Sequence, residues 1–418
     1  MKRGRAWRWP ALLLAGLAAA PAGAQEAPRL HVALAPGAPE TVFAAPHDGC
    51  DPDDVPDAPV RAFRGADGGV TLFGLHSDNR ALKGPSFDRL KIDCHVVYPS
   101  HGDADPTRYD DRSWIAATWT DDGRTVSALI HHEYQANEHP GRCRFPDYMQ
   151  CWFNTVLEVR STDGGDDFSR PATVVASAPF RQDHDQGRHR GFFNPSNIVS
   201  DGRYAYFMAS TTGWSRDGTA AAGTPGLAPE AGLAPAPGDA RAAGSDQEAG
   251  VCLFRSEHPA DPRAWRAWDG RAFTVAYGDP YRAKPQTAPC ATVAPFPAPV
   301  GSIVKVEPGG LWLAVFQAKA DAGVFPVPGF YDATSRDLLH WSAPRLLLAG
   351  PTLYDDACAA GGPLIAYPVI LDPASPSRNF DRSGAVADLY YDVLVTQGCT
   401  ITGRRSLVRR RIAIDAVR

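Results

Sequence analysis

Short apolar runs, each broken by a compact polar turn, recur along most of the chain. In four segments an apolar strand leads through an acidic residue or Pro and then Gly into a second apolar strand. These segments are 60–75, 114–130, 197–209 and 302–316, with turns at 66–69, 121–123, 200–202 and 307–310. Such turns between β-branched and aromatic residues are strong hairpin signals, because they need a positive φ. The pattern predicts an all-β protein built from hairpins.

A larger repeating unit emerges when the neighbouring segments are included. A second hairpin follows three of the first ones, at 156–175, 251–268 and 329–341, and a fifth pair of strands lies at 364–367 and 387–395. Two hairpins make a four-stranded antiparallel sheet, and five such sheets arranged radially make a propeller. We therefore expect an all-β fold, a five-bladed β-propeller of four-stranded antiparallel blades. Strand 30–34 is expected to close the ring beside the last blade.

The first 24 residues have a basic head, a short apolar centre and the small-residue exit Ala22-Gly23-Ala24. This is the pattern of a secretory signal peptide, and its apolar run is too short to span a bilayer. We expect cleavage after Ala24, one domain over 25–418 and a secreted or periplasmic protein without membrane insertion. The segment 219–244, with 10 Ala, 5 Gly and 4 Pro, is expected to be a flexible insertion.

Composition and charge limit the classes of partner that the protein can bind. The 39 Gly and 38 Pro of the 418 residues fit a turn-rich chain. The formal net charge of -5 becomes more negative once the basic leader is removed. Nucleic acid is then an unsuitable partner, because phosphate binding needs a basic face. We expect a monomer.

The eight cysteines all follow the leader. An even number in an exported protein indicates disulfides, although eight cysteines allow 105 pairings. Proximity along the chain suggests the pairs 143–151, 50–94, 252–290 and 358–399. A zinc site is the alternative, and the absence of Cys-x-x-Cys weakens it. No cofactor is expected, with a structural calcium as the one option left open.

Two turns carry a family resemblance. Ser161-x-Asp163-x-Gly165-x-x-Phe168 matches the Asp box of sialidase-like propellers, and the segment 335–342 resembles an outer-blade turn of five-bladed hydrolases. The chain therefore resembles the five-bladed β-propeller glycoside hydrolases of arabinanase and fructosidase type, with a sialidase-like Asp box. The Asp box is a folding device. The resemblance implies a sugar site in the central funnel, where the innermost strands start and the second strands end.

Glycoside hydrolysis needs one carboxylic acid and one carboxylate. The resemblance places a base Asp, often followed by Pro, at the head of the first inner strand, where Asp57-Ala58-Pro59 stands. The alternatives for Asp57 are an acidic turn continuing the run 51–54 and a calcium loop. Asp111 falls where the family has its orienting Asp, and the alternative is a surface or hairpin-start aspartate.

The family's acid is a Glu in the third blade, but this chain has Asn194-Pro195 there. Glu133, at the end of a strand with apolar neighbours, is the substitute we expect, since such surroundings favour a general acid. His132 could act instead, and a structural, hydrogen-bonded histidine is the alternative.

The expected substrate contacts come from the same rim: Arg61, Arg80, His132, Asn194 and Trp214. Arg61 and Arg80 could clamp a substrate carboxylate as sialidase arginines do, or form salt bridges to Asp57 or Asp111.

These observations lead us to expect an exported glycoside hydrolase-like protein acting on a glycan or glycoside. A non-catalytic propeller that binds carbohydrate or another surface ligand, and a sialidase-like hydrolase of an acidic sugar, are the alternatives. Phosphate loops and Gly-x-Ser-x-Gly elbows are missing from the sequence, so nucleotide chemistry and serine hydrolysis have no support.

Overall fold

The computed structural model describes residues 29–214, 247–282, 288–321 and 323–417. The expected leader, 1–24, and the Ala/Gly/Pro-rich segment, 219–244, lie outside these residues. Within them almost all regular structure is β-strand, so the predicted all-β class is confirmed. The helices are single turns: η1 Phe87–Arg89, η2 Pro106–Arg108, η3 Ala136–Glu138, α1 Tyr148–Cys151 and α2 Ala357–Ala360. In this described part no helix is long and apolar enough to cross a membrane.

The first sheet is four-stranded, in the order β3-β4-β5-β6. Its strands are β3 Pro56–Arg64, β4 Val70–Leu75, β5 Arg80–Gly84 and β6 Lys91–Val96. The β3–β4 turn contains Gly68 at φ 88°, the positive φ that the hairpin pattern predicts. Every residue of β4 is buried, so this strand packs on both faces.

The next sheet is ten-stranded and follows the path β16-β15-β14-β13-β11-β9-β8-β7, with β10 on β9 and β12 on β13. Its strands are β7 Arg112–Trp119, β8 Val126–Gln135, β9 Trp152–Ser161, β10 Thr173–Ala176, β11 Arg190–Phe193, β12 Val199–Ser200, β13 Ala205–Thr211, β14 Gly250–Ser256, β15 Arg266–Trp268 and β16 Phe273–Val275. The short strand β11 pairs with β9 in parallel and with β13 in antiparallel fashion.

A five-stranded sheet follows in the order β20-β19-β18-β17-β22. Its strands are β17 Val300–Val306, β18 Leu311–Ala318, β19 Gly329–Ser335, β20 Arg345–Ala349 and β22 Arg382–Ser383. The β18 strand is buried along its whole length and lies between two hydrogen-bonded neighbours.

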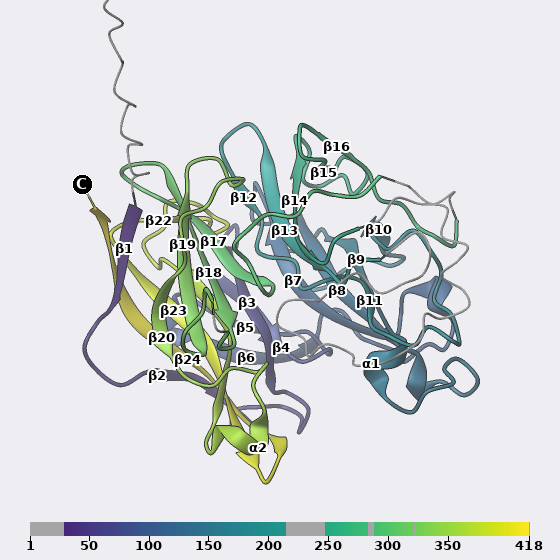
Figure 1. The fold of residues 1–418 in the computed structure, drawn as a ribbon. Helices are drawn as coiled ribbons and strands as arrows, with labels where there is room; N and C mark the ends of the chain where they lie inside the picture. Colours follow the sequence, from purple (N-terminus) through teal and green to yellow (C-terminus); the bar gives the residue numbers. More distant parts are fainter. Residues whose placement is uncertain (1–28, 215–246, 283–287, 322, 418) are drawn as a thin grey trace, which may run out of the picture.

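The last sheet, also five-stranded, joins the two ends of the described chain. Its strands are β1 Arg29–Leu34, β2 Glu40–Ala44, β21 Leu364–Leu371, β23 Val386–Gln397 and β24 Thr400–Val417. Antiparallel pairing of β1 with β24 confirms the prediction that strand 30–34 lies beside the last unit. Figure 1 shows this contact as the purple β1 alongside the yellow end of the chain.

The five predicted strand pairs are all present as antiparallel ladders. The grouping of strands into sheets differs from the expectation of five separate four-stranded sheets, because the described strands form four sheets of unequal size. The physical reason is β11, whose two backbone edges connect the second and third predicted units into one sheet.

A buried arginine connects strands of three different sheets. Arg61 in β3 is 2% exposed. Its Nη1 donates to the carbonyls of Val60 and Gly301 at 3.1 and 2.9 Å, its Nη2 donates to the carbonyl of Pro195 at 3.1 Å, and its Nε donates to the carbonyl of Ala116. Burial lowers the pKa of this guanidinium to about 9. One side chain thus connects β3, β7, β17 and the segment before β12.

Two asparagines, the buried Asn79 and the partly buried Asn197, each bond to the backbone of a neighbouring strand. Asn79 accepts a hydrogen bond from the Ile115 amide at 2.7 Å and donates to the Ser113 carbonyl at 2.8 Å. Asn197 accepts from the Ile303 amide at 2.8 Å and donates to the carbonyl of the same residue at 2.9 Å. Each amide replaces a missing ladder partner at the edge of an inner strand, which buried backbone groups require.

The turn at 161–168 is held by its own side chains. Ser161 Oγ lies 2.6 Å from Asp163 Oδ1, and Ser161 Oγ accepts from the Gly165 amide at 2.8 Å. Asp163 Oδ1 also accepts from the amides of Asp166 and Asp167, each at 3.1 Å. Ser161 and Asp163 therefore stabilise the backbone of this turn.

The eight cysteines, all of them in the described residues, form four disulfides. The pairs are Cys50–Cys94, Cys143–Cys151, Cys252–Cys290 and Cys358–Cys399, as proximity along the chain suggested. No sulfur is left for the zinc alternative, since the described chain has no free cysteine.

We predict that Arg61→Met lowers the free energy of unfolding by about 3 kcal/mol or more, because each carbonyl left without its donor costs about 1–3 kcal/mol. Denaturant unfolding followed by tryptophan fluorescence measures this. Arg124→Met, at an exposed position in the β7–β8 turn, is the control and should change stability by less than about 0.5 kcal/mol. Equal losses in the two variants would contradict a central role for Arg61.

Candidate functional site

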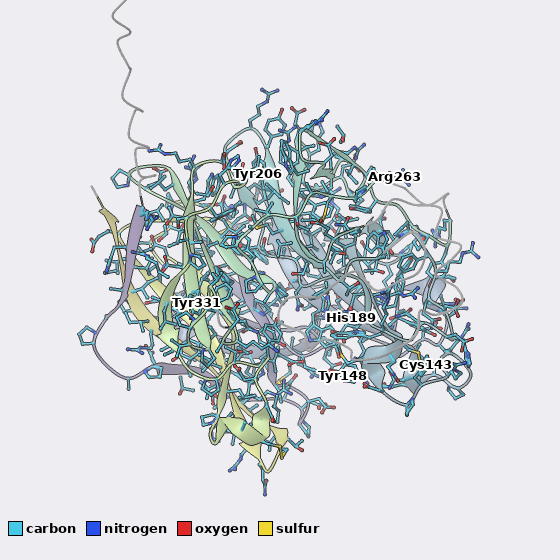
Figure 2. The ribbon with its side chains drawn as sticks, in the orientation of Figure 1. Cys143, Tyr148, His189, Tyr206, Arg263 and Tyr331 are labelled. Carbon is cyan, nitrogen blue, oxygen red and sulfur yellow. A yellow bond between two sulfur atoms is a disulfide. The ribbon has the colours of Figure 1, made fainter. Side chains whose placement is uncertain are left out.

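A cavity of about 820 Å³ is lined by residues from several strands and loops. The start of β3, the start of β7 and the end of β8 line it, together with the segments 146–149 and 193–195. This is the convergence that the hairpin pattern predicts. In Figure 2, Tyr148 and His189, which both line the cavity, lie below Tyr206 and Arg263.

The lining mixes carboxylates with aromatic rings. The carboxylates are Asp57, Glu133, Glu138 and Asp147. The aromatic residues, histidines apart, are Trp114, Tyr148, Trp152, Phe193, Tyr354 and Tyr367. Among the lining residues of the described chain Arg112 is the one arginine, and its Nη2 donates to Glu138 Oε2 at 2.6 Å.

Glu133 projects from β8 between two hydrogen-bond donors on the same strand. His131 Nε2 lies 2.8 Å from Glu133 Oε1, and Gln135 Nε2 donates to Glu133 Oε2 at 2.8 Å. Alternate residues of a strand share a face, so β8 presents all three side chains to the cavity. Both carboxylate oxygens therefore have a donor from the protein.

Further hydrogen bonds fix the orientation of His131 and Gln135, the two donors to Glu133. The backbone amide of Asn194 donates to His131 Nδ1 at 3.2 Å, so this nitrogen carries no proton and Nε2 must carry it. Arg112 Nη1 donates to Gln135 Oε1 at 3.2 Å, which directs the amide nitrogen of Gln135 towards Glu133. The position of Glu133 thus depends on a chain of contacts from Arg112 to Asn194.

Asp57 faces the same cavity from the start of β3. Its Oδ1 accepts a hydrogen bond from Arg405 Nη1 on β24, and its Oδ2 lies 3.9 Å from His76 Nε2. The side chain is 24% exposed. Burial raises the pKa of Asp57 most, and the negative charge of Glu133 raises it further, while Arg405 and His76 oppose the shift. The two carboxyl groups are therefore close enough to interact.

A second acidic group lies behind Asp57. Asp392 on β23 is 1% exposed, and its Oδ2 has no hydrogen-bond partner among the described residues. Burial and the charge of Asp57 raise the pKa of Asp392 well above its usual value. Asp392 is not a lining residue of the cavity, but its charge also raises the pKa of Tyr367, which does line it.

An aromatic wall closes one side of the cavity. Trp152 stacks on His189 with ring centroids 4.2 Å apart, and the ring centroids of Tyr148 and Trp152 are 5.5 Å apart. Tyr148 is 46% exposed and belongs to the short helix α1, whose last residue, Cys151, is bonded to Cys143. The disulfide holds this wall in place, and its exposed ring faces are suited to stacking on an apolar ligand surface.

Of the residues predicted from the sequence, Asp57, Glu133 and Asn194 line the cavity. Asp111 does not line it and is 2% exposed. Its Oδ2 accepts from the Gln135 amide at 2.7 Å and lies 3.0 Å from His139 Nε2. Asp111 thus holds the end of the strand that carries Glu133, without reaching the cavity.

The two arginines expected to clamp an anion lie elsewhere. The donors of Arg61 are directed to backbone carbonyls, so neither the clamp nor the salt bridge to Asp57 or Asp111 is formed. Arg80 donates to Asp54 Oδ1 at 2.7 Å and to Asp78 Oδ2 at 3.2 Å. Neither arginine is a lining residue of the cavity.

His132 and Trp214 are packing residues outside the cavity lining. His132 is 1% exposed and packs edge-on against Tyr109, and burial lowers its pKa to about 3. Trp214 lies in the core against Phe180 and Phe192.

The acidic run 51–54 is explained by local structure. Asp54 Oδ2 accepts from the amides of Cys50 and Asp51 at 2.8 and 2.9 Å, while Oδ1 pairs with Arg80. The described residues contain no group of three or more His, Cys, Asp or Glu side chains arranged to hold a metal ion. The calcium option stays a prediction.

Several residues of the site were not predicted from the sequence. His131 and Gln135 had a signal, because strand alternation places them on the face of Glu133 and places His132 on the other face. Arg405 had none, since it meets Asp57 across 348 positions of sequence. Tyr148 and Trp152 had only an indirect signal, their place beside the Cys143–Cys151 pair.

No family model matches the chain, and no curated protein matches it. Solved structures of similar shape include a protein of unknown function from Dyadobacter fermentans DSM 18053, with a TM-score of 0.46 and 9% identity over 87% of this chain and 96% of that one. A putative exo-beta-1,3-galactanase from Bifidobacterium bifidum s17 has a TM-score of 0.44 and 11% identity over 86% and 91%. An alpha-L-arabinanase from Cellvibrio cellulosa has a TM-score of 0.43 and 9% identity, over 85% of this chain and 91% of that one. Identities this low transfer no residue role.

We predict that acid destabilises the fold through two buried histidines. Burial lowers the pKa of both His132 and His189 to about 3, against about 6.5 in the unfolded chain. Between these values the unfolded state binds more protons, so stability falls as the pH drops below about 6.5, by roughly 1.4 kcal/mol per pH unit for each histidine.

The variant His132→Gln tests this prediction. The slope of unfolding free energy against pH, measured by denaturant unfolding between pH 6 and 4, should decrease by about 1.4 kcal/mol per unit. The stability of the variant at neutral pH gives its baseline. An unchanged slope would show that His132 is not kept neutral in the folded protein.

Proposed function

We propose that this protein is an exported, glycoside hydrolase-like protein that holds a glycan or glycoside in the cavity. The observation that carries the proposal is the pair Asp57 and Glu133. These carboxyl groups come from different sheets, face one cavity and interact electrostatically. Paired carboxyl groups flanking a substrate are what glycoside hydrolysis requires.

The rest of the cavity fits a sugar. Ligand sites of this size combine apolar and aromatic surface with a few placed polar groups. Tyr148 and Trp152 supply ring faces, while Asn194 and His76 add side chains that can bond hydroxyl groups. Export fits the four disulfides, which are typical of oxidising compartments.

Five blades remain our proposal for the architecture. Divided at β11, the ten-stranded sheet gives two units, one containing β7–β10 and the other containing β12–β16. Together with the three remaining sheets this makes five units around Arg61. The Asp-box turn lies between β9 and β10 of the second unit and is not part of the cavity lining.

Within this proposal the roles differ in kind. Asp57 and Glu133 are the catalytic pair, Asn194 is a substrate contact, and Asp111 is a positioning residue that acts through the backbone of Gln135. Arg61, Arg80, His132 and Trp214 are structural. The sialidase-like alternative has no support in the described residues, because the lining arginine, Arg112, is engaged by Gln135 and Glu138.

We predict that Asp57→Asn and Glu133→Gln each lower kcat/KM for the best polysaccharide substrate at least about a hundredfold, since positioned proton transfer contributes about 10²–10⁴-fold. The assay uses a panel of aryl glycosides and of plant and microbial polysaccharides. Hydrolysis is measured as chromogen release from the aryl glycosides and as new reducing ends from the polysaccharides.

The matched controls are Asp167→Asn and Glu257→Gln. Both side chains are mainly exposed and neither lines the cavity. They should retain parental activity. A hydrolase whose activity survives both cavity substitutions would have its chemistry elsewhere, and a protein that hydrolyses nothing in the panel would not be the enzyme proposed.

A second candidate is a non-catalytic carbohydrate-binding protein. The observation that favours it is the ion pair between Asp57 and Arg405, because an arginine stabilises a charged carboxylate whereas hydrolysis needs one neutral acid. Under this alternative the aromatic wall, and not the carboxyl pair, determines the affinity.

We predict that Tyr148→Ala weakens glycan binding about tenfold, equivalent to about 1.4 kcal/mol, because the variant loses a stacking surface. Titration calorimetry with the polysaccharide that binds best measures this for either candidate. Tyr204→Ala, which lies outside the cavity lining, is the control. Equal affinities of Tyr148→Ala and the parent would place the glycan away from the wall.

A further inference from the structure

The hydrogen bonds at the two carboxyl groups are not equivalent. Glu133 accepts from His131 Nε2 on one oxygen and from Gln135 Nε2 on the other, both at 2.8 Å. Both bonds require a proton-free lone pair on Glu133 facing the donor. A carboxylate has about four lone-pair sites, so about two remain on Glu133, and one of them can accept a hydrogen bond from a water molecule in the cavity.

The donors cannot exchange roles with Glu133. If His131 turned Nε2 into an acceptor, its proton would have to move to Nδ1, which already accepts from the Asn194 amide at 3.2 Å. If the amide of Gln135 rotated, its NH₂ group would face the guanidinium of Arg112, which donates to Gln135 Oε1 at 3.2 Å. Each alternative places two donors against each other, which costs a buried hydrogen bond.

Asp57 is different because one of its oxygens is free of donors. Arg405 Nη1 donates to Oδ1. Among the described residues Oδ2 has no hydrogen-bond donor, and its ion-pair partner His76 Nε2 is 3.9 Å away, too far for a hydrogen bond. Asp57 lines the cavity, so a proton on Oδ2 can be offered to a ligand there.

The charged and titratable groups around Asp57 come from several elements. Arg405 on β24 and His76 after β4 lower its pKa, while burial and Glu133 on β8 raise it, and the result is a raised pKa. Tyr367 on β21 and Asp392 on β23 lie close enough for the charge of Asp57 to raise their own pKa values. The surroundings thus support the proton that the free oxygen can hold.

On the basis of the proposed function, we propose that Asp57 is the general acid and Glu133 the base, with His131 as the positioning residue whose Nε2–H holds Glu133. This reverses the roles that the family resemblance implies. The oxygen of a water molecule bonds to the anomeric carbon, and Glu133 takes a proton from that water. The bond from the anomeric carbon to the leaving oxygen breaks, its electron pair stays with that oxygen, and the proton of Asp57 Oδ2 neutralises it.

The leaving group distinguishes acid from base. A dinitrophenolate leaves without a proton, whereas an alkoxide or a phenolate needs one. For a sugar that the parent protein hydrolyses, Asp57→Asn should stay within about tenfold of the parent on the dinitrophenyl glycoside and fall at least about a hundredfold on the phenyl glycoside. Glu133→Gln should fall at least about a hundredfold on both. The opposite pattern, with Glu133→Gln spared on the dinitrophenyl glycoside, overturns the assignment.

The role of His131 has its own test. His131→Gln keeps a nitrogen donor for Glu133, and His131→Phe removes it. In the phenylalanine variant the acidic limb of the pH–rate profile should move to higher pH, since Glu133 loses a hydrogen bond to its charged form, and the glutamine variant should restore the parental limb. Identical profiles for the parent and His131→Phe overturn the positioning role.

Two measurements need no activity and separate this inference from the proposed function. In ¹⁵N NMR of the parent protein, the His131 ring should carry its proton on Nε2. In ¹³C NMR, the Asp57 carboxyl should titrate above the usual aspartate range and move back towards it in Glu133→Gln, which removes a negative charge. A proton on His131 Nδ1, or an Asp57 that titrates in the ordinary range or below, overturns the inference. Absence of hydrolysis in the panel overturns the proposed function.

Discussion

The burial of one guanidinium organises this structure. Arg61 has no carboxylate within reach of its donors in the described residues, and it bonds four backbone carbonyls contributed by β3, β7, β17 and the segment before β12. A buried charge is costly unless it is well hydrogen-bonded. The inner strands must therefore bring their carbonyls to one point, and their starts then meet at the same end of the molecule. That meeting of strand starts produces the cavity.

The carboxyl groups of the cavity are also held in fixed positions by hydrogen bonds. Glu133 is oriented by β8 itself, through His131 and Gln135, and those two side chains are oriented by Asn194 and Arg112. Asp57 is held from the opposite side by Arg405 of β24. Groups that are already oriented need no reorganisation when charge develops on a substrate, which is the main source of electrostatic catalysis. The same rigidity would also favour selective binding, so it is shared by both candidate functions.

The hairpins were predictable because turn chemistry and strand alternation are local. Asp57 and Glu133 could be named as facing one rim, since a strand's start and end follow from its turns. The joining of two units by β11 could not be foreseen, because a four-residue strand that pairs on both edges leaves no periodic signal. Arg61 was misjudged for a different reason: its residue type suggests an anion site, but only the converged fold shows carbonyls around it. His132 was chosen over His131 although alternation favours the residue two positions from Glu133.

The pairing of β24 with β1, β2 and β23 bears on how the chain is made. Residues 29–34 and 40–44 find their partner strand only when residues 400–417 have been synthesised. Until then β1, β2 and β23 expose unpaired backbone edges, which are templates for aggregation. Contacts between such distant segments also slow folding. The sheet that closes the molecule thus delays completion of the fold until translation has passed β24. A nascent chain interrupted before that point would still expose the unpaired strand edges.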